Sequence, residues 1–252
     1  MNNKRLGLTI DNYKREKKLK RIVKITLLFI FLLLIIVYFV VGIIYNSGNF
    51  SITLDKNLYY EKGLIVYDDV DYKVFRSELY AKPPETFDNI SYKWLPSDVG
   101  ESTGGSHNGD NYLAYTFFIE NTGKEVADYY SELVIDDVIK KVDEAVRIRV
   151  YKNGEATTYA KISAKNTAEE GTTPFIDEKL VATDHISNFK PGDIDTYTVV
   201  LWIEGSDPEC NDNILGGEIK ISMNFNSEHV EDKERGKVWK DEIVNTLNVL
   251  ED

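Results

Sequence analysis

The strongest constraint on this chain is a run of twenty uncharged residues, Ile25–Ile44, with the sequence ITLLFIFLLLIIVYFVVGII. As a helix rising about 1.5 Å per residue, such a run spans about 30 Å, the thickness of the hydrocarbon core of a bilayer. A buried helix of this length in a soluble protein would normally carry polar side chains. We therefore predict a single membrane span that begins at Ile25 and ends at Ile44.

The segment before this run is strongly basic, which sets the predicted orientation. Residues 14–24 have the sequence KREKKLKRIVK, and short basic flanks of a membrane span stay in the cytoplasm. We expect residues 1–24 to form a basic cytoplasmic tail, of which residues 2–11 are too few to fold. Residues 45–252 would then lie outside the cell, held at the cell membrane by one span.

The apolar run differs from a cleaved signal peptide. Cleaved signals have an apolar core of about 7–15 residues, followed by a small-x-small cleavage site. Here the core is longer, and it ends in Ile44-Tyr45-Asn46-Ser47-Gly48, a poor site for a signal peptidase. The sequence therefore favours an uncleaved signal anchor.

Charge and composition exclude several classes of protein. The chain has 30 Lys and Arg and 42 Asp and Glu. Residues 1–24 contain nine of the basic and two of the acidic residues, so the rest has 21 basic and 40 acidic residues and a formal charge of −19. An acidic body repels phosphate, so we expect no nucleic-acid partner. One Cys and three His cannot build a disulfide framework or a Cys/His metal cluster.

The exported part shows the alternation of β-strands. The clearest example is Gly217–Phe225, where GEIKISMNF alternates apolar and polar residues along one buried and one wet face. The run Asp195–Ile203 becomes apolar on both faces at its end, which predicts a central strand. Further strand-like runs are Tyr112–Glu120, Asp128–Ile135, Val146–Lys152 and Glu155–Ile162.

Turn residues and one helical pattern complete the expected elements. Asn121-Thr122-Gly123 predicts a hairpin between two strands, and Asn153-Gly154 predicts a type I′ turn. Lys190-Pro191-Gly192-Asp193 predicts a turn into the following strand. Within Ile135–Val146, apolar residues recur at helical spacing, which predicts a short amphipathic helix capped near Asp136.

These elements predict a mainly β protein: an extracellular antiparallel β-sandwich, Ig-like or of the jelly-roll type, with one short helix insertion and a preceding transmembrane helix. After the tail (1–24) and span (25–44), we expect juxtamembrane strands and loops at 45–110 and the sandwich core at 111–226. Residues 227–252 would form an acidic tail, as a helix or a loose appendage. The predicted core residues are Phe117, Ile119, Leu133, Val200, Trp202, Ile219, Ile221 and Phe225.

Two stretches also suggest a family. Phe117–Gly123 followed by Ala127-Asp128-Tyr129 resembles the strand, Asn-Thr-Gly turn, strand signature of bacterial surface β-sandwiches. Lys190–Asp193 leading into Tyr197–Trp202, then Glu204-Gly205 and Gly216–Ile219, is similar to the closing strands of such a domain.

On these residues the chain resembles the camelysin/TasA-type exported matrix proteins of Gram-positive bacteria. It is more similar still to an uncharacterised membrane-anchored set with the run Trp-[Ile/Leu]-Glu-Gly-x-Asp-Pro-Glu-Cys. The resemblance covers about residues 110–225 and implies a tethered β-sandwich. The matrix proteins are released by a dedicated signal peptidase. This chain departs from that pattern, because its cleavage site is poor.

The most unusual loop is Glu204–Glu218, with the sequence EGSDPECNDNILGGE. Its carboxylates Asp207, Glu209, Asp212 and Glu218 are oxygen donors of the kind that calcium prefers, although they lack the spacing of an EF-hand. The alternative is an acidic surface loop between two core strands, with Gly216 and Gly217 at a turn or bulge. Calcium is the one cofactor that the sequence raises.

Cys210, the single thiol, either links two chains outside the cell or lies as a small apolar residue under this loop. His107, His185 and His229 lie in three separate polar segments. The sequence has no His-Glu-x-x-His and no Gly-x-Ser-x-Gly motif, so no catalytic residue is assigned.

The sequence thus predicts a non-enzymatic, membrane-anchored cell-surface protein that acts in binding, adhesion or extracellular assembly. Its expected partners are the bilayer and either further copies of itself, through edge strands, or another envelope protein. One alternative is an accessory subunit of an envelope complex that uses Glu228–Asp252 as its contact. A surface hydrolase is the other.

Overall fold

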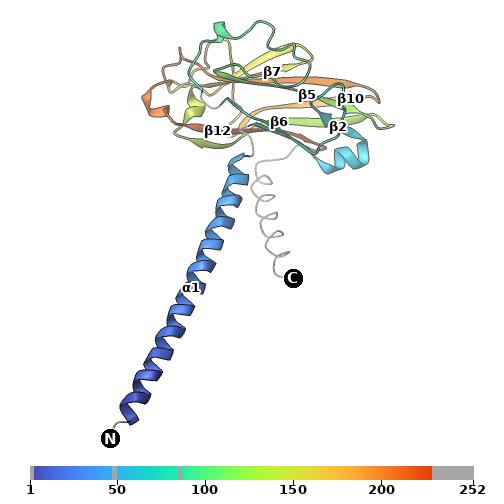
Figure 1. The fold of residues 1–252 in the computed structure, drawn as a ribbon. Coiled ribbons are helices and arrows are strands. Elements are labelled where there is room, and N and C mark those ends of the chain that lie inside the picture. Colours follow the sequence, from blue (N-terminus) through green and yellow to red (C-terminus); the bar gives the residue numbers. More distant parts are fainter. Residues whose placement is uncertain (1–2, 47–49, 85–86, 229–252) are drawn as a thin grey trace. The chain divides into compact units, whose positions relative to one another are not determined.

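The computed structural model describes residues 3–46, 50–84 and 87–228, and it divides into two units at Ser47 and Gly48 (Figure 1). The acidic tail beyond Glu228, which includes His229, lies outside the described residues. The first unit is the helix α1 and the second is a β-rich domain.

Helix α1 runs without a break from Asn3 to Asn46. Its 44 residues correspond to about 66 Å, more than twice the core of a bilayer. Within it, Tyr13–Tyr38 form a candidate membrane span, with a mean hydropathy of 2.5 in the most apolar stretch and no buried side chain. The expectation that residues 2–11 do not fold is wrong from Asn3 onward, because the basic segment continues the helix toward the N-terminus.

The second unit is built from strands and a few single helical turns. The strands are β1 (Phe50–Leu54), β2 (Leu64–Tyr67), β3 (Glu78–Ala81), β4 (Gly105–Ser106), β5 (Tyr112–Asn121), β6 (Ala127–Ile139), β7 (Val146–Lys152), β8 (Glu155–Ala160), β9 (Thr173–Pro174), β10 (Leu180–Phe189), β11 (Ile194–Ile203) and β12 (Glu218–Asn226). The helical turns are η1 (Leu58–Lys62), η2 (Tyr92–Trp94), η3 (Val142–Glu144) and η4 (Asp212–Ile214).

The strands form two sheets that pack as a sandwich. One sheet has the order β10-β6-β12-β1-β3, and the other has the order β2-β5-β11-β7-β8-β9 with β4 beside β5. Most pairs are antiparallel, as predicted, but β1 pairs in parallel with β12 and β8 with β9. The strands of residues 50–84 therefore belong to the same sandwich as those that follow.

The alternation of the strands sorts their side chains into two cores. All eight core residues predicted from the sequence are buried. Six of them lie in the main core between the sheets, where Phe117 stacks on Tyr197 at 5.5 Å. Val200 and Trp202 point to the other face of β11, into a smaller core beneath the connection that carries Ile90 and Val99. This second core explains why β11, a central strand as predicted, is apolar on both faces.

The helix predicted over Ile135–Val146 is wrong. Residues up to Ile139 continue β6, and only Val142–Glu144 form a single helical turn. A bulge causes the misleading spacing: Ile135 pairs with Ile221 and Asp137 pairs with Lys220, so one extra residue separates the buried Ile135 from the partly buried Val138. An inserted residue in a strand thus turns a spacing of two into a spacing of three.

The hairpin predicted at Asn121-Thr122-Gly123 is also wrong, because β5 and β6 belong to different sheets. The segment instead crosses between the sheets, anchored by the fully buried Asn121. Its Nδ2 donates to the carbonyls of Glu125 and Phe189 at 3.0 and 2.9 Å, and its Oδ1 accepts from the amide of Gly123 at 2.9 Å. The type I′ turn is confirmed, since Asn153 and Gly154 have φ of 50° and 88° and join β7 to β8.

Candidate functional site

The acidic loop after β11 is tied down by its own carboxylates. Glu204 is buried, and its Oε2 accepts hydrogen bonds from Trp202 Nε1 and the Tyr92 amide, both at 3.0 Å. Its Oε1 accepts from the Ser206 hydroxyl at 2.7 Å. Burial raises the pKa of Glu204, but these hydrogen bonds outweigh it and hold the pKa below its usual range. The carboxylate therefore fastens η2 and the loop to the end of β11.

A buried ion pair fixes the next part of the loop. Arg147 on β7 reaches Asp207 with Nη2 2.5 Å from Oδ2, and their side chains are 5% and 0% exposed. The same nitrogen lies 3.5 Å from Glu169 Oε2, on the connection that follows β8. One guanidinium thus joins two loops to the outer face of the seven-stranded sheet.

The structure brings together two of the four predicted calcium ligands. Glu169, Asp207 and Glu209 place ligand oxygens within 4.8 Å of one another, the one such group among the described residues. Asp212 lies on η4 and Glu218 begins β12, and neither belongs to the group. Glu169 comes from a connection 38 positions before Asp207, so the sequence of the loop alone did not indicate it.

The carboxyl groups of this cluster shift one another's pKa in opposite directions. A hydrogen bond with Asp207 raises the pKa of Glu209. Burial raises the pKa of Asp207, but its hydrogen bonds with Glu209 and Arg147 outweigh burial and lower it. The cluster therefore contains its own cation, Arg147. This guanidinium reduces the net negative charge that a calcium ion would neutralise.

The remaining residues singled out in the sequence are Cys210 and the histidines, of which His107 and His185 are described. The Cys210 thiol is half-buried, and burial, followed by the nearby Asp207 and Glu204 carboxylates, raises its pKa. Linkage of two chains through it stays a prediction. His107 Nε2 lies 2.9 Å from the Thr116 hydroxyl and burial lowers its pKa, whereas His185 stacks on Tyr130 at 4.3 Å.

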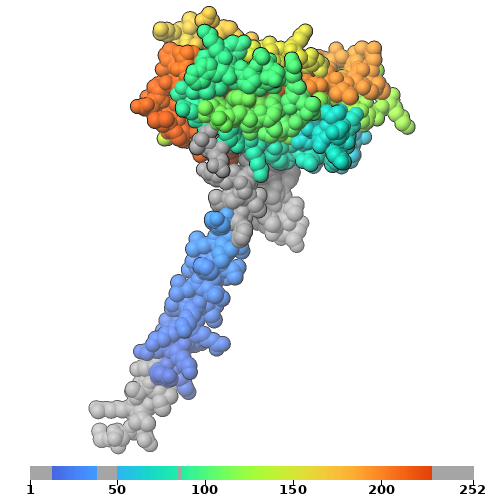
Figure 2. Space-filling model, turned by 45° about the horizontal axis from the view of Figure 1, so that its top comes forward, coloured from blue at the N-terminus to red at the C-terminus, as the bar shows by residue number. Residues whose placement is uncertain are grey.

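A pocket opens where the edge of the seven-stranded sheet is interrupted. Strand β2 pairs with β5 as far as Tyr67 opposite Phe118, and β4 resumes the same edge at Gly105 opposite Thr116. The chain leaves the sheet after Tyr67 and returns at Gly104, where a Cβ atom would lie 2.4 Å from the Asp68 carbonyl. Figure 2 shows the green segment around residue 100 spread over the face turned to the viewer.

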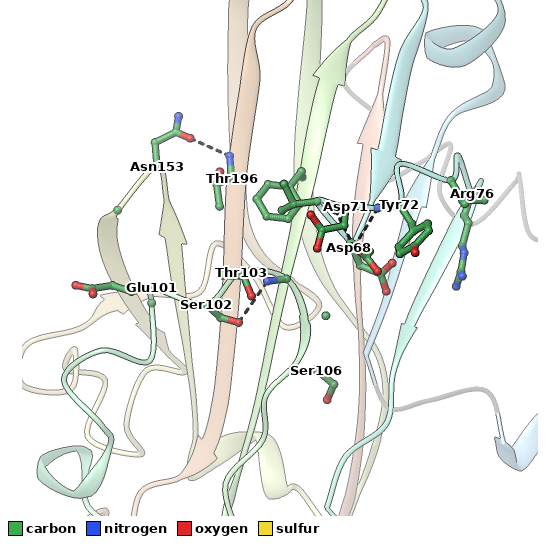
Figure 3. Close-up of a pocket in the computed structure, with 18 residues that line it drawn as sticks. Asp68, Asp71, Tyr72, Arg76, Glu101, Ser102, Thr103, Ser106, Asn153 and Thr196 are labelled. Carbon is green, nitrogen blue, oxygen red and sulfur yellow. Dashed lines mark hydrogen bonds between the residues drawn. The ribbon is translucent and has the colours of Figure 1, made fainter.

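The pocket has a volume of about 1190 Å³. One wall is formed by residues 68–72, 74 and 76 and the other by residues 100–106, and Phe118 and Thr196 lie on neighbouring strands between them. The β7–β8 turn closes one end, where Asn153 Oδ1 accepts from the Thr196 amide at 2.9 Å (Figure 3). Strands and a tight turn thus give the pocket a rigid floor under two loop walls.

Hydrogen bonds shape the acidic wall. The Asp69 Oδ1 accepts from the amides of Asp71 and Tyr72 at 2.9 and 3.1 Å, an Asx turn that reverses the chain (Figure 3). The Tyr115 hydroxyl donates to Asp68 Oδ2 at 2.5 Å. This site was not predicted from the sequence, although the acidic run Asp68-Asp69-Val70-Asp71 was a visible signal.

Comparisons with known proteins add little. No family model and no curated protein matches the chain. Two solved structures of the beta-glucosidase from Kluyveromyces marxianus, one in complex with glucose and one labelled with selenomethionine, share 16% and 11% identity with it. Their TM-scores are 0.23 and 0.22, over 68% of this chain. The chain spans about a sixth of the glucosidase, 16% and 17% respectively, and at these scores the likeness carries no argument.

Proposed function

We propose that the chain is a non-enzymatic, single-span surface protein that holds its β-sandwich outside the cell and binds a ligand in the pocket at the interrupted sheet edge. The observation that carries the proposal is that pocket, about 1190 Å³ in volume on a floor of two paired strands. Binding sites are commonly built in this way, from loops positioned by a rigid scaffold.

The membrane part of the proposal depends on α1. The basic residues of its N-terminal half favour a cytoplasmic N-terminus, with the apolar half as an uncleaved anchor. The outward placement of the sandwich follows from this orientation. Kinship with the camelysin/TasA-type proteins of Gram-positive bacteria remains part of the proposal, and the two-sheet fold is compatible with it.

The sheet edges favour binding over assembly by strand pairing. Edge strands β2 and β3 have four residues each, β3 is followed by Pro83-Pro84, and β9 has two residues. The long edge strand, β10, has register shifts near both ends. Short strands, prolines and bulges are the devices that protect sheet edges from pairing. The accessory-subunit alternative depends on residues beyond Glu228, which lie outside the described residues.

A pocket-blocking variant tests the proposal. Full-length protein in detergent is mixed with fluorescent probes of three kinds: a basic peptide, an acidic peptide and a neutral oligosaccharide. We expect one kind to bind the wild type and to lose binding in Thr103→Trp, because Thr103 is an exposed wall residue whose replacement fills the space. Thr183→Trp, at an exposed position on β10, is the matched control. Equal binding of every probe to both variants would remove the pocket as the binding site.

A further inference from the structure

Carboxylates outnumber cations on the walls of the pocket. Asp68, Asp69, Asp71 and Glu101 line it together with a single guanidinium, that of Arg76, an excess of three negative charges. The neighbouring Lys73 does not offset them, since its Nζ lies 2.8 Å from Glu120 Oε2 outside the lining. The exported part is itself acidic, so its field attracts cations toward the pocket and repels anions.

Two of these carboxylates are free for a ligand. Asp68 accepts from Tyr115, and Asp69 holds the Asx turn. Among the described residues, the side-chain oxygens of Asp71 and Glu101 accept no hydrogen bond and form no ion pair. Figure 3 shows them on opposite sides of the pocket, with the Glu101 carboxylate directed away from Asp71, so a ligand would have to extend across the pocket and past this wall to meet both.

Apolar side chains beside the carboxylates place a second requirement on the ligand. Val70, Tyr72 and Val74 line the pocket and are 50%, 74% and 57% exposed. Lysine and arginine side chains match such a surface, because their aliphatic stems pack on apolar groups while the charged heads reach carboxylates. A small inorganic cation would leave these apolar groups uncovered.

The wide spacing of the carboxylates favours a peptide over a single metal ion as the ligand. A calcium site needs several oxygens at about 2.3–2.6 Å from one ion. Among the described residues, the group that brings carboxylate oxygens close enough lies elsewhere, at Glu169, Asp207 and Glu209. The volume of about 1190 Å³ also exceeds the range of about 300–1,000 Å³ typical of small-molecule sites.

We propose that the pocket binds a basic peptide segment, with lysine or arginine side chains reaching Asp71 on one wall and Glu101 on the other. The inference rests on the proposed function and adds the class of ligand. The aliphatic stems of the peptide's basic side chains cover Val70, Tyr72 and Val74, and their charges offset the acidic lining. Exposed ion pairs are individually weak, each changing affinity by up to about fivefold, so specificity requires several of them.

The test uses the full-length protein in detergent and a fluorescent peptide of alternating lysine and alanine. The variant Asp71→Asn/Glu101→Gln removes the two unpaired carboxylates and should weaken binding at least about threefold. The control Glu125→Gln/Glu178→Gln removes the same charge at exposed positions that do not line the pocket, and should change affinity less than about twofold.

The outcomes distinguish a wrong class of ligand from a wrong binding site. Equal weakening by both double variants would show attraction by net charge alone and would overturn the peptide site. If the oligosaccharide or the acidic peptide is the probe lost in Thr103→Trp, the pocket binds but the ligand class is wrong. If Thr103→Trp affects no probe, the proposed function itself falls.

Discussion

Among single changes at the residues that tie the acidic loop to the sheet, Arg147→Met should be the most damaging, because Asp207 is the more deeply buried partner of the ion pair. The Asp207 side chain is 0% exposed and loses its cation, so a charged carboxylate is left buried. Breaking a buried pair in this way typically costs about 3–5 kcal/mol of the free energy of unfolding.

The reverse change should cost less. In Asp207→Asn, Arg147 keeps Glu169 at 3.5 Å as a partner, and the amide oxygen can still accept a hydrogen bond from Arg147. We expect about 1–3 kcal/mol for this variant. In the double variant no unpaired buried charge remains, so its cost should fall short of the sum of the single costs by about 1–3 kcal/mol.

Urea unfolding of the full-length protein in detergent measures the three costs, with the fluorescence of the buried Trp202 contributing to the signal. Equal dependence on urea concentration among the variants would show that the change lies in stability rather than in the denatured state. A cost below about 1 kcal/mol for Arg147→Met, or additive single costs, would refute the buried pair as the tie between the loops.

Three further predictions follow from the same contacts. The lowered pKa of Glu204 means that its contribution to stability is present above the unfolded pKa of about 4.3 and is lost as pH falls through the folded pKa. Glu204→Gln should therefore flatten the loss of stability below about pH 5 in acid unfolding curves. An unchanged curve would contradict this prediction. Calcium should leave the melting temperature of the wild type unchanged, because Arg147 already serves as the cation of the cluster. It should raise the melting temperature of Arg147→Gln, in which Glu169, Asp207 and Glu209 lack a cation. A clear shift of the wild-type melting temperature by calcium would count against this. Protease added to intact cells should digest the sandwich, detected with an antibody to it, and protection of a membrane-bound sandwich would reverse the proposed topology.

Much of the sandwich could be predicted because its alternation is local. In Gly217–Phe225 every second residue is apolar, and the structure has β12 there with those residues buried. The pattern failed in β6, where one bulge residue shifted the alternation and imitated a helix between Ile135 and Val138. The strands β1, β2 and β3 went unassigned, since each has only four or five residues and pairs with partners distant in sequence.

The sites depended still more on distant contacts. The loop network needs Arg147 and Glu169, which lie well before the acidic loop in the chain. The pocket needs the segments 68–76 and 100–106 to meet across an interrupted edge. The run from Trp202 to Cys210 was conspicuous in sequence, but the contacts of Glu204 and Asp207 explain it as a means of holding loops in place.

The parallel pairing of β1 with β12 has a consequence for how the protein reaches its final form. Phe50 pairs with Ile221, so the first strand after α1 lacks this neighbour until some 170 further residues have been made. Closing so long a loop is slow compared with forming local hairpins such as β7–β8. Under the proposed topology, β1 would therefore cross the membrane well before β12, and this pair of strands would form only after the last strand had emerged.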